Sequence, residues 1–482
     1  MGYNAREFAR LLHRAGQSIW QVLPLNPTDN SGFSPYSALS AMAGNTLLIS
    51  PDCLVEDGLL HASDLKAHAL PQQGKADFKA ARIIKDKLLA KAYDKFNDGD
   101  FPPLKAAFDQ FCEAQAWWLD DWAAFIVQMT ACKGKPWYEW PEKYKNRSEG
   151  PSEEQMRREK WTQFIFERQW QGLKAYCHSL GIRIFGDLPF YVSYNSVDVW
   201  ANKELFRLGP KGEMISVAGV PPDYFNDEGQ LWGMPIYDWE QLKQTRYNWW
   251  VQRIRRNMEW FDLLRLDHFR AFAAYWEVPA GEKTAKKGEW VKGPGNELFR
   301  LLQKEMKSLP LVAEDLGEIT DDVYALRDKF QLPGMKVLQF AFGEDMGTSP
   351  HIPHHHAENF LVYTGTHDNN TSKGWYFQDM DRNGRRRLNQ YTGRRVADKD
   401  AHLVLCRLAY SSIAKTAILP MQDVLGLDGS ARMNKPADTG ANWLWRMLPG
   451  QFSETVVAML KEWTLTYGRS NCESSNQKQE KT

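Results

Sequence analysis

Seven short apolar runs are spread along this 482-residue chain, and helical segments separate most of them. Short apolar runs bounded by Gly, Pro and polar residues are typical of buried strands. Strands that alternate with helices favour a parallel sheet, because a parallel connection needs a long crossover. The pattern predicts an α/β fold with strands at residues 18–25, 182–188, 261–267, 310–314, 335–342, 359–365 and 416–421.

Charged residues follow three of these runs and favour one α/β architecture over another. FDLLRLDHFR ends its apolar run at Asp267, LPLVAEDLGE ends at Glu314, and LVYTGTHDNN places Asp368 just beyond its run. Catalytic residues of parallel barrels lie at the C-terminal ends of several different strands. The pattern therefore favours a (β/α)8 TIM barrel over a doubly wound sheet. Such a barrel has eight strands, so the count is one short.

The chain divides into segments that differ in residue pattern and composition. Helical periodicity dominates residues 51–146, which are predicted to form a helical insertion after the second strand. The catalytic barrel would then comprise residues 1–50 and 147–469. Residues 190–238 are rich in Gly, Pro and aromatic residues, and are predicted to be a loop-rich insertion over the active site. The polar tail, 470–482, is predicted to be disordered.

Composition excludes several classes of partner. Lys+Arg and Asp+Glu both number 60, so the zero net charge argues against a nucleic-acid or anionic-membrane partner. No apolar stretch approaches the roughly 18 residues of a spanning helix. Six cysteines without a CxxC pair, and no visible signal peptide, indicate a reduced cytoplasmic protein. The sequence contains no nucleotide-binding loop and no HExxH metal motif, so no cofactor is expected. The 20 tryptophans are compatible with core packing and also with a site for sugar rings.

Several side chains near the strand ends suit glycosidic-bond chemistry. Arg265 and Asp267 lie two positions apart and share one face of a strand, so Arg265 can keep Asp267 ionised as a nucleophile. A structural ion pair is an equally good interpretation. Glu314 is favoured over Asp315 as a general acid because of its longer stem, and Asp315 suits a helix N-terminal cap better. His367 precedes Asp368 and can donate to a sugar hydroxyl. A single His-Asp dipeptide is, however, more often a hydrogen-bonded pair within a loop.

The chain resembles the amylomaltases or disproportionating enzymes, which are the 4-α-glucanotransferases of glycoside hydrolase family 77. The resemblance covers nearly the whole length. It rests on nine ordered motifs: QVLPLNPT, SPYSALSAMAGN, GDLPFYV, GVPPDYFNDEGQLWG, LLRLDHFR, VAEDLG, TGTHDN, LPMQDVLGL, and ARMN with the following KP and ADTGANWLWR.

The resemblance implies a role for each motif residue. Asp267 is similar in position to the family's nucleophile, Glu314 to its general acid/base, and Asp368 to its transition-state stabiliser. The implied substrate-binding residues are Arg265 and His367 beside the cleaved sugar, Tyr36 and Asp187 in the same subsite, and Trp232 on a mobile loop over the acceptor side.

The resemblance implies transfer of α-1,4-glucan segments from a donor malto-oligosaccharide to the 4-hydroxyl of an acceptor glucose or glucan, by a retaining double displacement. Retention predicts about 5 Å between the carboxyls of Asp267 and Glu314. Family members usually begin with a further strand upstream of this Met1, so the first barrel strand is expected to be missing. Two alternatives stay open at this point: an amylase-type α-1,4-glucan hydrolase, and an inactive glucan-binding fragment.

Overall fold

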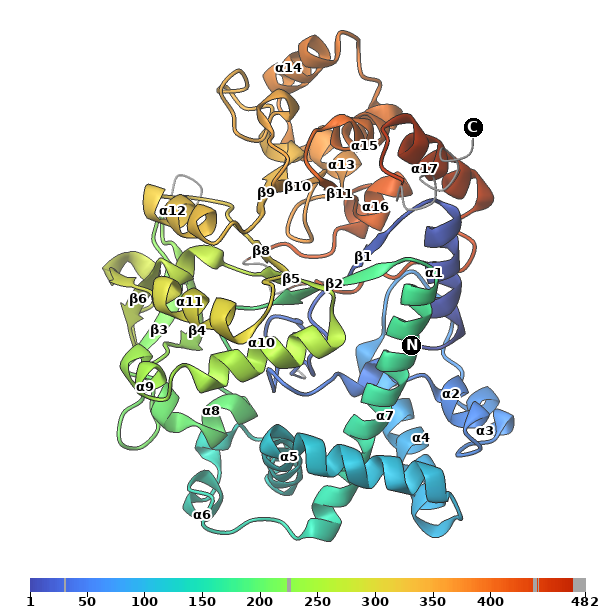
Figure 1. Ribbon diagram of the computed structural model, residues 1–482, viewed down its shortest axis with the longest axis vertical. Coiled ribbons are helices and arrows are strands. Elements are labelled where there is room, and N and C mark those ends of the chain that lie inside the picture. Colours follow the sequence, from blue (N-terminus) through green and yellow to red (C-terminus); the bar gives the residue numbers. More distant parts are fainter. Residues whose placement is uncertain (30–31, 223–226, 437–439, 441, 471–482) are drawn as a thin grey trace, which may run out of the picture.

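A computed structural model describes residues 1–470 apart from 30–31, 223–226, 437–439 and 441 (Figure 1). The expected tail therefore lies almost wholly outside the described residues. All seven expected strands form, most of them shorter than predicted. They are β1 (Ile19–Gln21), β2 (Arg183–Leu188), β5 (Leu263–Leu266), β8 (Leu311–Ala313), β9 (Gly334–Val337), β10 (Phe360–Tyr363) and β11 (Thr416–Ile418).

These strands lie side by side in one parallel arc. The first sheet has the order β1-β2-β5-β8 and the second β11-β10-β9, with every pair parallel. The two sheets meet where the Ala313 amide of β8 donates to Pro333 O, just before β9, at 2.8 Å. The α/β prediction is confirmed, and the carboxyl ends of all seven strands lie at one edge.

The arc is open between β11 and β1. Within the described part of the chain, no strand pairs with the outer edge of either one. The residues of both strands are only half-buried, whereas those of β8 and β9 are fully buried. A cavity of about 290 Å³ lies at this place, lined by Ile19, Gln21 and Ile418 among others. The count of seven strands made from the sequence therefore holds among the described residues.

Helices cover the outside of the arc. The helix α7 (Glu153–Ser179) begins with a capping box in which Ser152 and Gln155 bond reciprocally, and it packs against α1 (Tyr3–Arg14) and α5 (Pro102–Ala131). Further helices around the arc are α10 (Asn248–Trp260), α11 (Gly295–Glu305), α12 (Asp321–Lys329), α14 (Arg382–Thr392), α15 (Ala401–Ser411), α16 (Met421–Val424) and α17 (Glu454–Thr466) (Figure 1).

Residues 51–146 are helical, as their periodicity predicts. The long helix α5 lies in the lower part of the view in Figure 1, where it crosses α7 and packs against it. The other helices of this segment are α2 (Pro51–Glu56), α3 (Ala62–Ala67), α4 (Phe78–Asp98) and α6 (Glu142–Lys145).

A third sheet, which is antiparallel, was not predicted. It comprises β3 (Ser216–Val220), β4 (Gln230–Pro235), β6 (Ala274–Pro279) and β7 (Glu289–Lys292), in the order β4-β3-β6-β7. Two of these strands lie inside the segment expected to be loop-rich, which also carries α8 (Val197–Ala201), while α9 (Trp239–Gln244) follows it. Gly219 in β3 faces Gln230 O so closely that a Cβ would lie 2.5 Å from that oxygen. This close approach explains a glycine in a strand interior.

Two strands end earlier than their apolar runs suggest. After Val337 the chain turns into a short 3-10 helix, Leu338–Phe340, and Gln339 donates its amide to Asn370 O at 2.8 Å. After β1 the Val22 amide still donates to Phe185 O, but Pro24 has no N–H to continue the ladder. Apolar character alone does not reveal where a strand leaves its sheet.

Candidate active site

The strand register brings the nucleophile and the acid candidates together. In the pairing of β5 with β8, Leu266 lies opposite Ala313, so the next residues on the two strands are Asp267 and Glu314. The ladder continues there, because the Glu314 amide donates to Leu266 O at 3.1 Å. On the other side of β5, Asp187 of β2 lies opposite Arg265. Adjacent parallel strands are about 4.8 Å apart, so these side chains are immediate neighbours.

The guanidinium of Arg265 lies at the centre of the cluster. Its Nη1 donates to both oxygens of Asp187, at 2.8 and 2.9 Å, and to Oδ1 of Asp267 at 2.8 Å. Its Nη2 lies 3.9 Å from Oε2 of Glu314. The predicted pairing of Arg265 with Asp267 across two strand positions is therefore present, and the same cation also contacts two further carboxylates.

Burial separates the protonation states of Asp267 and Glu314. Burial raises the pKa of Asp267 to about 6, against the opposing charge of Arg265. Burial raises the pKa of Glu314 to about 8, and the charge of Asp267 adds to the effect. Near neutral pH Asp267 is thus mainly ionised while Glu314 carries a proton. Two carboxyls with separated pKa values can divide the roles of nucleophile and acid.

Main-chain amides hold Glu314 in place. The amide of His268 donates to Oε2 at 2.7 Å, and that of Leu316 donates to Oε1 at 3.2 Å. Asp315 points the other way, accepting from Met335 N at 2.7 Å and from Arg327 Nη1 at 2.5 Å. Only Glu314 faces the site, as predicted. The interpretation of Asp315 as a helix N-terminal cap is wrong, because its carboxylate is buried against Arg327 and joins β8 to β9.

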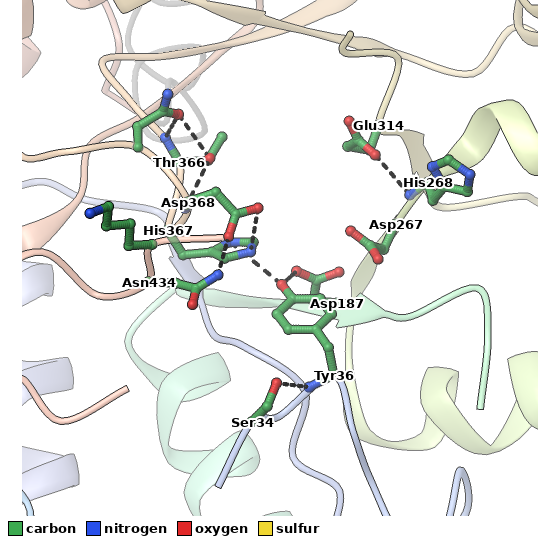
Figure 2. Close-up of polar contacts among 12 residues, drawn as sticks. Ser34, Tyr36, Asp187, Asp267, His268, Glu314, Thr366, His367, Asp368 and Asn434 are labelled. Carbon is green, nitrogen blue, oxygen red and sulfur yellow. Dashed lines mark hydrogen bonds and ion pairs between the residues drawn. The ribbon is translucent and has the colours of Figure 1, made fainter. Parts of the chain in front are cut away.

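Asp368 lies on the opposite side of the site, in the loop after β10. In Figure 2, Asp267 and Glu314 lie together on one side and Asp368 with His367 on the other. Burial alone would raise the pKa of Asp368, but His367 and Asn434 outweigh it and lower the pKa to about 2. The Nε2 of His367 lies 3.3 Å from Oδ2, and Asn434 Nδ2 donates to Oδ1 at 2.6 Å. This carboxylate is therefore a fixed negative charge.

Tyr36 links the two sides. Its hydroxyl donates to Oδ2 of Asp187 at 2.7 Å, and its ring stacks on that of His367 with centroids 5.0 Å apart (Figure 2). Trp443 lies against both rings, at 5.7 Å from Tyr36 and 5.8 Å from His367. An aromatic wall of this kind suits the apolar face of a sugar ring.

One cavity of about 1340 Å³ joins these residues. It is lined by seven of the eight predicted site residues, and Asp187 lies buried behind the lining. The ring of Trp232 lies edge-on to His268 at 4.9 Å between centroids and near Tyr191 at 6.0 Å. The predicted residues that line the cavity are Tyr36, Trp232, Arg265, Asp267, Glu314, His367 and Asp368.

The lining also includes residues that were not singled out from the sequence, among them Asn434, Trp443 and His268. Asn434 and Trp443 lie in the last of the quoted motifs, and His268 directly follows Asp267. Only their position in a quoted motif could have identified these residues, because neither a strand period nor a charge pattern marks them. In the part of the chain that the structure describes, His, Cys, Asp and Glu side chains nowhere form a group of three or more that could hold a metal ion.

Fold and site together define an α/β protein in which Asp267, Glu314 and Asp368 line one large cavity. The family model described as 4-alpha-glucanotransferase matches residues 1–451, and the chain belongs to that family. It is 44% identical over 480 residues to a 4-alpha-glucanotransferase of Synechocystis, covering 97% of this chain and 94% of the relative. It is 42% identical over 478 residues to the Thermus thermophilus 4-alpha-glucanotransferase, covering 96% and 93% of the two chains. The solved amylomaltase of Streptococcus agalactiae, in complex with acarbose, superposes with a TM-score of 0.92 at 35% identity over 98% of this chain and 96% of that one.

Proposed function

We propose that this protein moves segments of α-1,4-glucan from a donor malto-oligosaccharide to the 4-hydroxyl of an acceptor glucose or glucan. It acts by a retaining double displacement in which Asp267, Glu314 and Asp368 divide the chemistry. The observation that carries the proposal is the register of β5 against β8. In support, the residues that follow the last pair of this register are Asp267, whose pKa is about 6, and Glu314, whose pKa is about 8.

In the first half-reaction, a carboxylate oxygen of Asp267 attacks C1 of the donor sugar. The C1–O bond breaks, and Glu314 gives its proton to the leaving 4-oxygen. The product is a glycosyl ester on Asp267 with the opposite anomeric configuration. Asp368, fixed as an anion, stabilises the positive charge that develops at C1.

In the second half-reaction, Glu314 takes the proton from the 4-hydroxyl of the acceptor. That oxygen attacks C1, the ester bond breaks, and Asp267 is released as a carboxylate. The net result is one glycosidic bond exchanged for another with retained configuration. Arg265 holds Asp267 throughout, while Tyr36 and His367 would form the wall against which the cleaved sugar lies.

The comparisons favour transfer over the two alternatives. A hydrolase of the amylase type uses the same carboxylates, but the family and the curated relatives named above are glucanotransferases. These relatives are matched over more than nine-tenths of their own length, and all three carboxylates line one cavity, which does not favour an inactive fragment.

Incubation of the purified protein with maltotriose tests the function. Transfer yields glucose together with a ladder of longer oligomers, whereas glucose and maltose alone would mean hydrolysis. The roles are tested separately with α-maltotriosyl fluoride, whose leaving group needs no acid. Asp267→Asn is expected to leave this donor intact, while Glu314→Gln should accumulate a glycosyl ester visible in the intact protein mass. Asp423→Asn, which alters a buried carboxylate outside the carboxylate-lined cavity, serves as a control and should do neither.

We also infer a cytoplasmic location. Support comes from the five described cysteines, all of which are free thiols, as in proteins of a reducing compartment. No helix in the described ranges is both long and apolar enough to cross a membrane. Fractionation of the source cells, followed by immunodetection, checks the compartment.

A further inference from the structure

His268 combines a buried ring nitrogen that has no hydrogen-bond partner among the described residues with a left-handed backbone. It directly follows the nucleophile candidate Asp267 and lines the same cavity. Its backbone has φ +51° and ψ +48°, in the left-handed region that a side chain with a Cβ rarely adopts. Strained backbone of this kind gathers at ligand sites, where the surrounding structure holds it in place.

The left-handed backbone of His268 positions its amide to hold the carboxyl of Glu314. After Asp267 the chain turns through His268 into a 3-10 helix, Phe269–Phe272, and the turn directs the His268 amide at Oε2 of Glu314, at 2.7 Å. This contact needs the backbone conformation and makes no use of the imidazole. Glycine would satisfy it with less strain. The main-chain role therefore gives no reason for a histidine at this position.

The imidazole has no hydrogen-bond partner in the described protein. Its Nε2 is buried and has no hydrogen-bond partner among the described residues. Buried polar atoms in folded proteins nearly always have a partner, so an unbonded one in a cavity points to a ligand. The cavity belongs to the site already described, so the partner sought is a part of the sugar substrate.

The neighbours of the ring indicate which part. Its centroid lies 4.9 Å from that of Trp232, edge-on at 82°, and 6.3 Å from that of Tyr191. Trp232 belongs to β4 of the antiparallel sheet and lines the same cavity. In Figure 2, His268 lies on the side of Asp267 and Glu314, across from His367. The wall at Tyr36 adjoins Asp187 and Asp368, where the cleaved sugar would lie. The ring of His268 therefore adjoins the other side of the reacting bond, beyond Glu314.

We propose that the imidazole of His268 hydrogen-bonds a hydroxyl of the acceptor sugar and helps to select a sugar over water as the acceptor. The inference rests on the proposed transfer function and names a residue that determines acceptor specificity. Burial lowers the pKa of His268 to about 3, so the ring is neutral during the reaction. A neutral imidazole offers one donor and one acceptor, which matches a sugar hydroxyl.

The variant His268→Gly separates the ring from the main chain. Glycine accepts the left-handed conformation and keeps the amide that holds Glu314, while the imidazole is lost. Gln331→Gly is the matched control, because Gln331 also has a positive φ, +54°, but is exposed and does not line the cavity. Asn, which tolerates this conformation and keeps a hydrogen-bonding side chain, provides a partial rescue at position 268.

Two rates are compared in each protein. Fluoride release from α-maltotriosyl fluoride without added sugar reports formation and hydrolysis of the glycosyl ester, and transfer to glucose reports use of the acceptor. In His268→Gly, fluoride release is expected to stay within about threefold of the parent while KM for glucose rises about tenfold, the range of one lost hydrogen bond. The KM of His268→Asn for glucose should lie between the values of the parent and of His268→Gly. Gln331→Gly should match the parent in both measurements.

Deoxy-glucose acceptors identify the contact. One of 2-deoxy-, 3-deoxy- or 6-deoxyglucose should be a poor acceptor for the parent, and His268→Gly should show no further loss with that same sugar. The inference would be overturned if every deoxy-glucose reduced transfer equally in the parent and in His268→Gly. So would an unchanged KM for glucose, or a collapse of fluoride release as large as the loss of transfer. A parent protein that only hydrolyses maltotriose would instead refute the proposed function, independently of His268.

Discussion

The charge of Asp187 is expected to set the acid limb of the pH–rate profile through Asp267. Both Asp187 oxygens accept from Nη1 of Arg265, and Oδ1 of Asp267 accepts from the same nitrogen, with 2.8 Å to the nearer oxygen in each case. The two carboxylates therefore have oxygens no more than 5.6 Å apart. Their repulsion opposes ionisation of Asp267, and it is one of the causes that raise the pKa of Asp267.

The variant Asp187→Asn removes this repulsion with little change in shape. Its amide oxygen can still accept from Arg265 and from the Tyr36 hydroxyl, which donates to this side chain at 2.7 Å. Two unit charges roughly 5 Å apart interact by about 3 kcal/mol at an effective dielectric constant of about 20. That energy corresponds to about 2 pKa units as an upper value. We expect the acid limb to fall from about 6 to between about 4 and 5.

The assay follows kcat/KM for glucose release from maltotriose between about pH 3.5 and about pH 9. The profile of kcat/KM reports the free enzyme, so the acid limb belongs to the nucleophile and the alkaline limb to the acid. The alkaline limb should stay near about 8, because the largest causes of the shift at Glu314 are burial, Arg265 and Asp267. Asp423→Asn is the control. It alters a buried carboxylate that binds Thr364 and Ser372, and it should leave both limbs in place.

An acid limb that stays in place or moves to higher pH in Asp187→Asn would refute the reasoning, because the charge of Asp187 would then not raise the pKa of Asp267. Stability must be followed alongside, since the variant leaves a buried Arg265 with one carboxylate fewer. We expect a loss of about 2 to 4 kcal/mol in the free energy of unfolding, measured in urea. Rates are therefore compared only where circular dichroism shows the variant to be folded.

Three further predictions follow from single contacts. Glu314→Gln should raise the thermal midpoint by a few degrees at about pH 9 and not at about pH 4, because a carboxyl whose folded pKa is raised destabilises the fold only once the pH passes its unfolded pKa; a gain at low pH would contradict this. Asn434→Ala should lower kcat about tenfold, since it removes a charged hydrogen bond to Asp368, and kinetics with maltotriose measure it; an unchanged kcat would mean that this contact is structural. Gly186→Ala should cost about 2 kcal/mol in urea unfolding, because its Cβ would lie 2.2 Å from the ring of Phe261, and an unchanged midpoint would show that the ring moves freely.

The parallel strands and the carboxylates could be predicted because each obeys a local rule. A buried strand is a short apolar run, and a charge at its end has few structural reasons to be there. The two-residue period of a strand then placed Arg265 beside Asp267, which the structure confirms. The choice of Glu314 over Asp315 rested on the longer stem of the glutamate side chain. The role given to Asp315 failed because its partners, Arg327 and Met335, come from the next helix and strand.

The rest of the site depends on contacts between distant segments that no local period reveals. Asn434 reaches Asp368 across 66 residues, and Trp443 meets Tyr36 across a still longer separation. The antiparallel sheet escaped prediction for a related reason. Its strand β3 is the short run SVAGV, and a glycine inside a strand weakens the sequence signal while allowing the close approach of Gln230 O.

Charge balance around Arg265 explains why the proton of the free enzyme lies on Glu314. One guanidinium faces three carboxylates, so full ionisation would leave two uncompensated negative charges at a largely buried site. A proton on one carboxylate relieves this repulsion, and it binds where the cation helps least. Asp187 and Asp267 each accept from Arg265 at 2.8 Å, whereas the nearest guanidinium nitrogen is 3.9 Å from Glu314. This geometry ranks Glu314 after Asp267 in the order of ionisation. The residue that we propose as the proton donor to the leaving sugar is thus the one that the cluster keeps protonated before substrate binds.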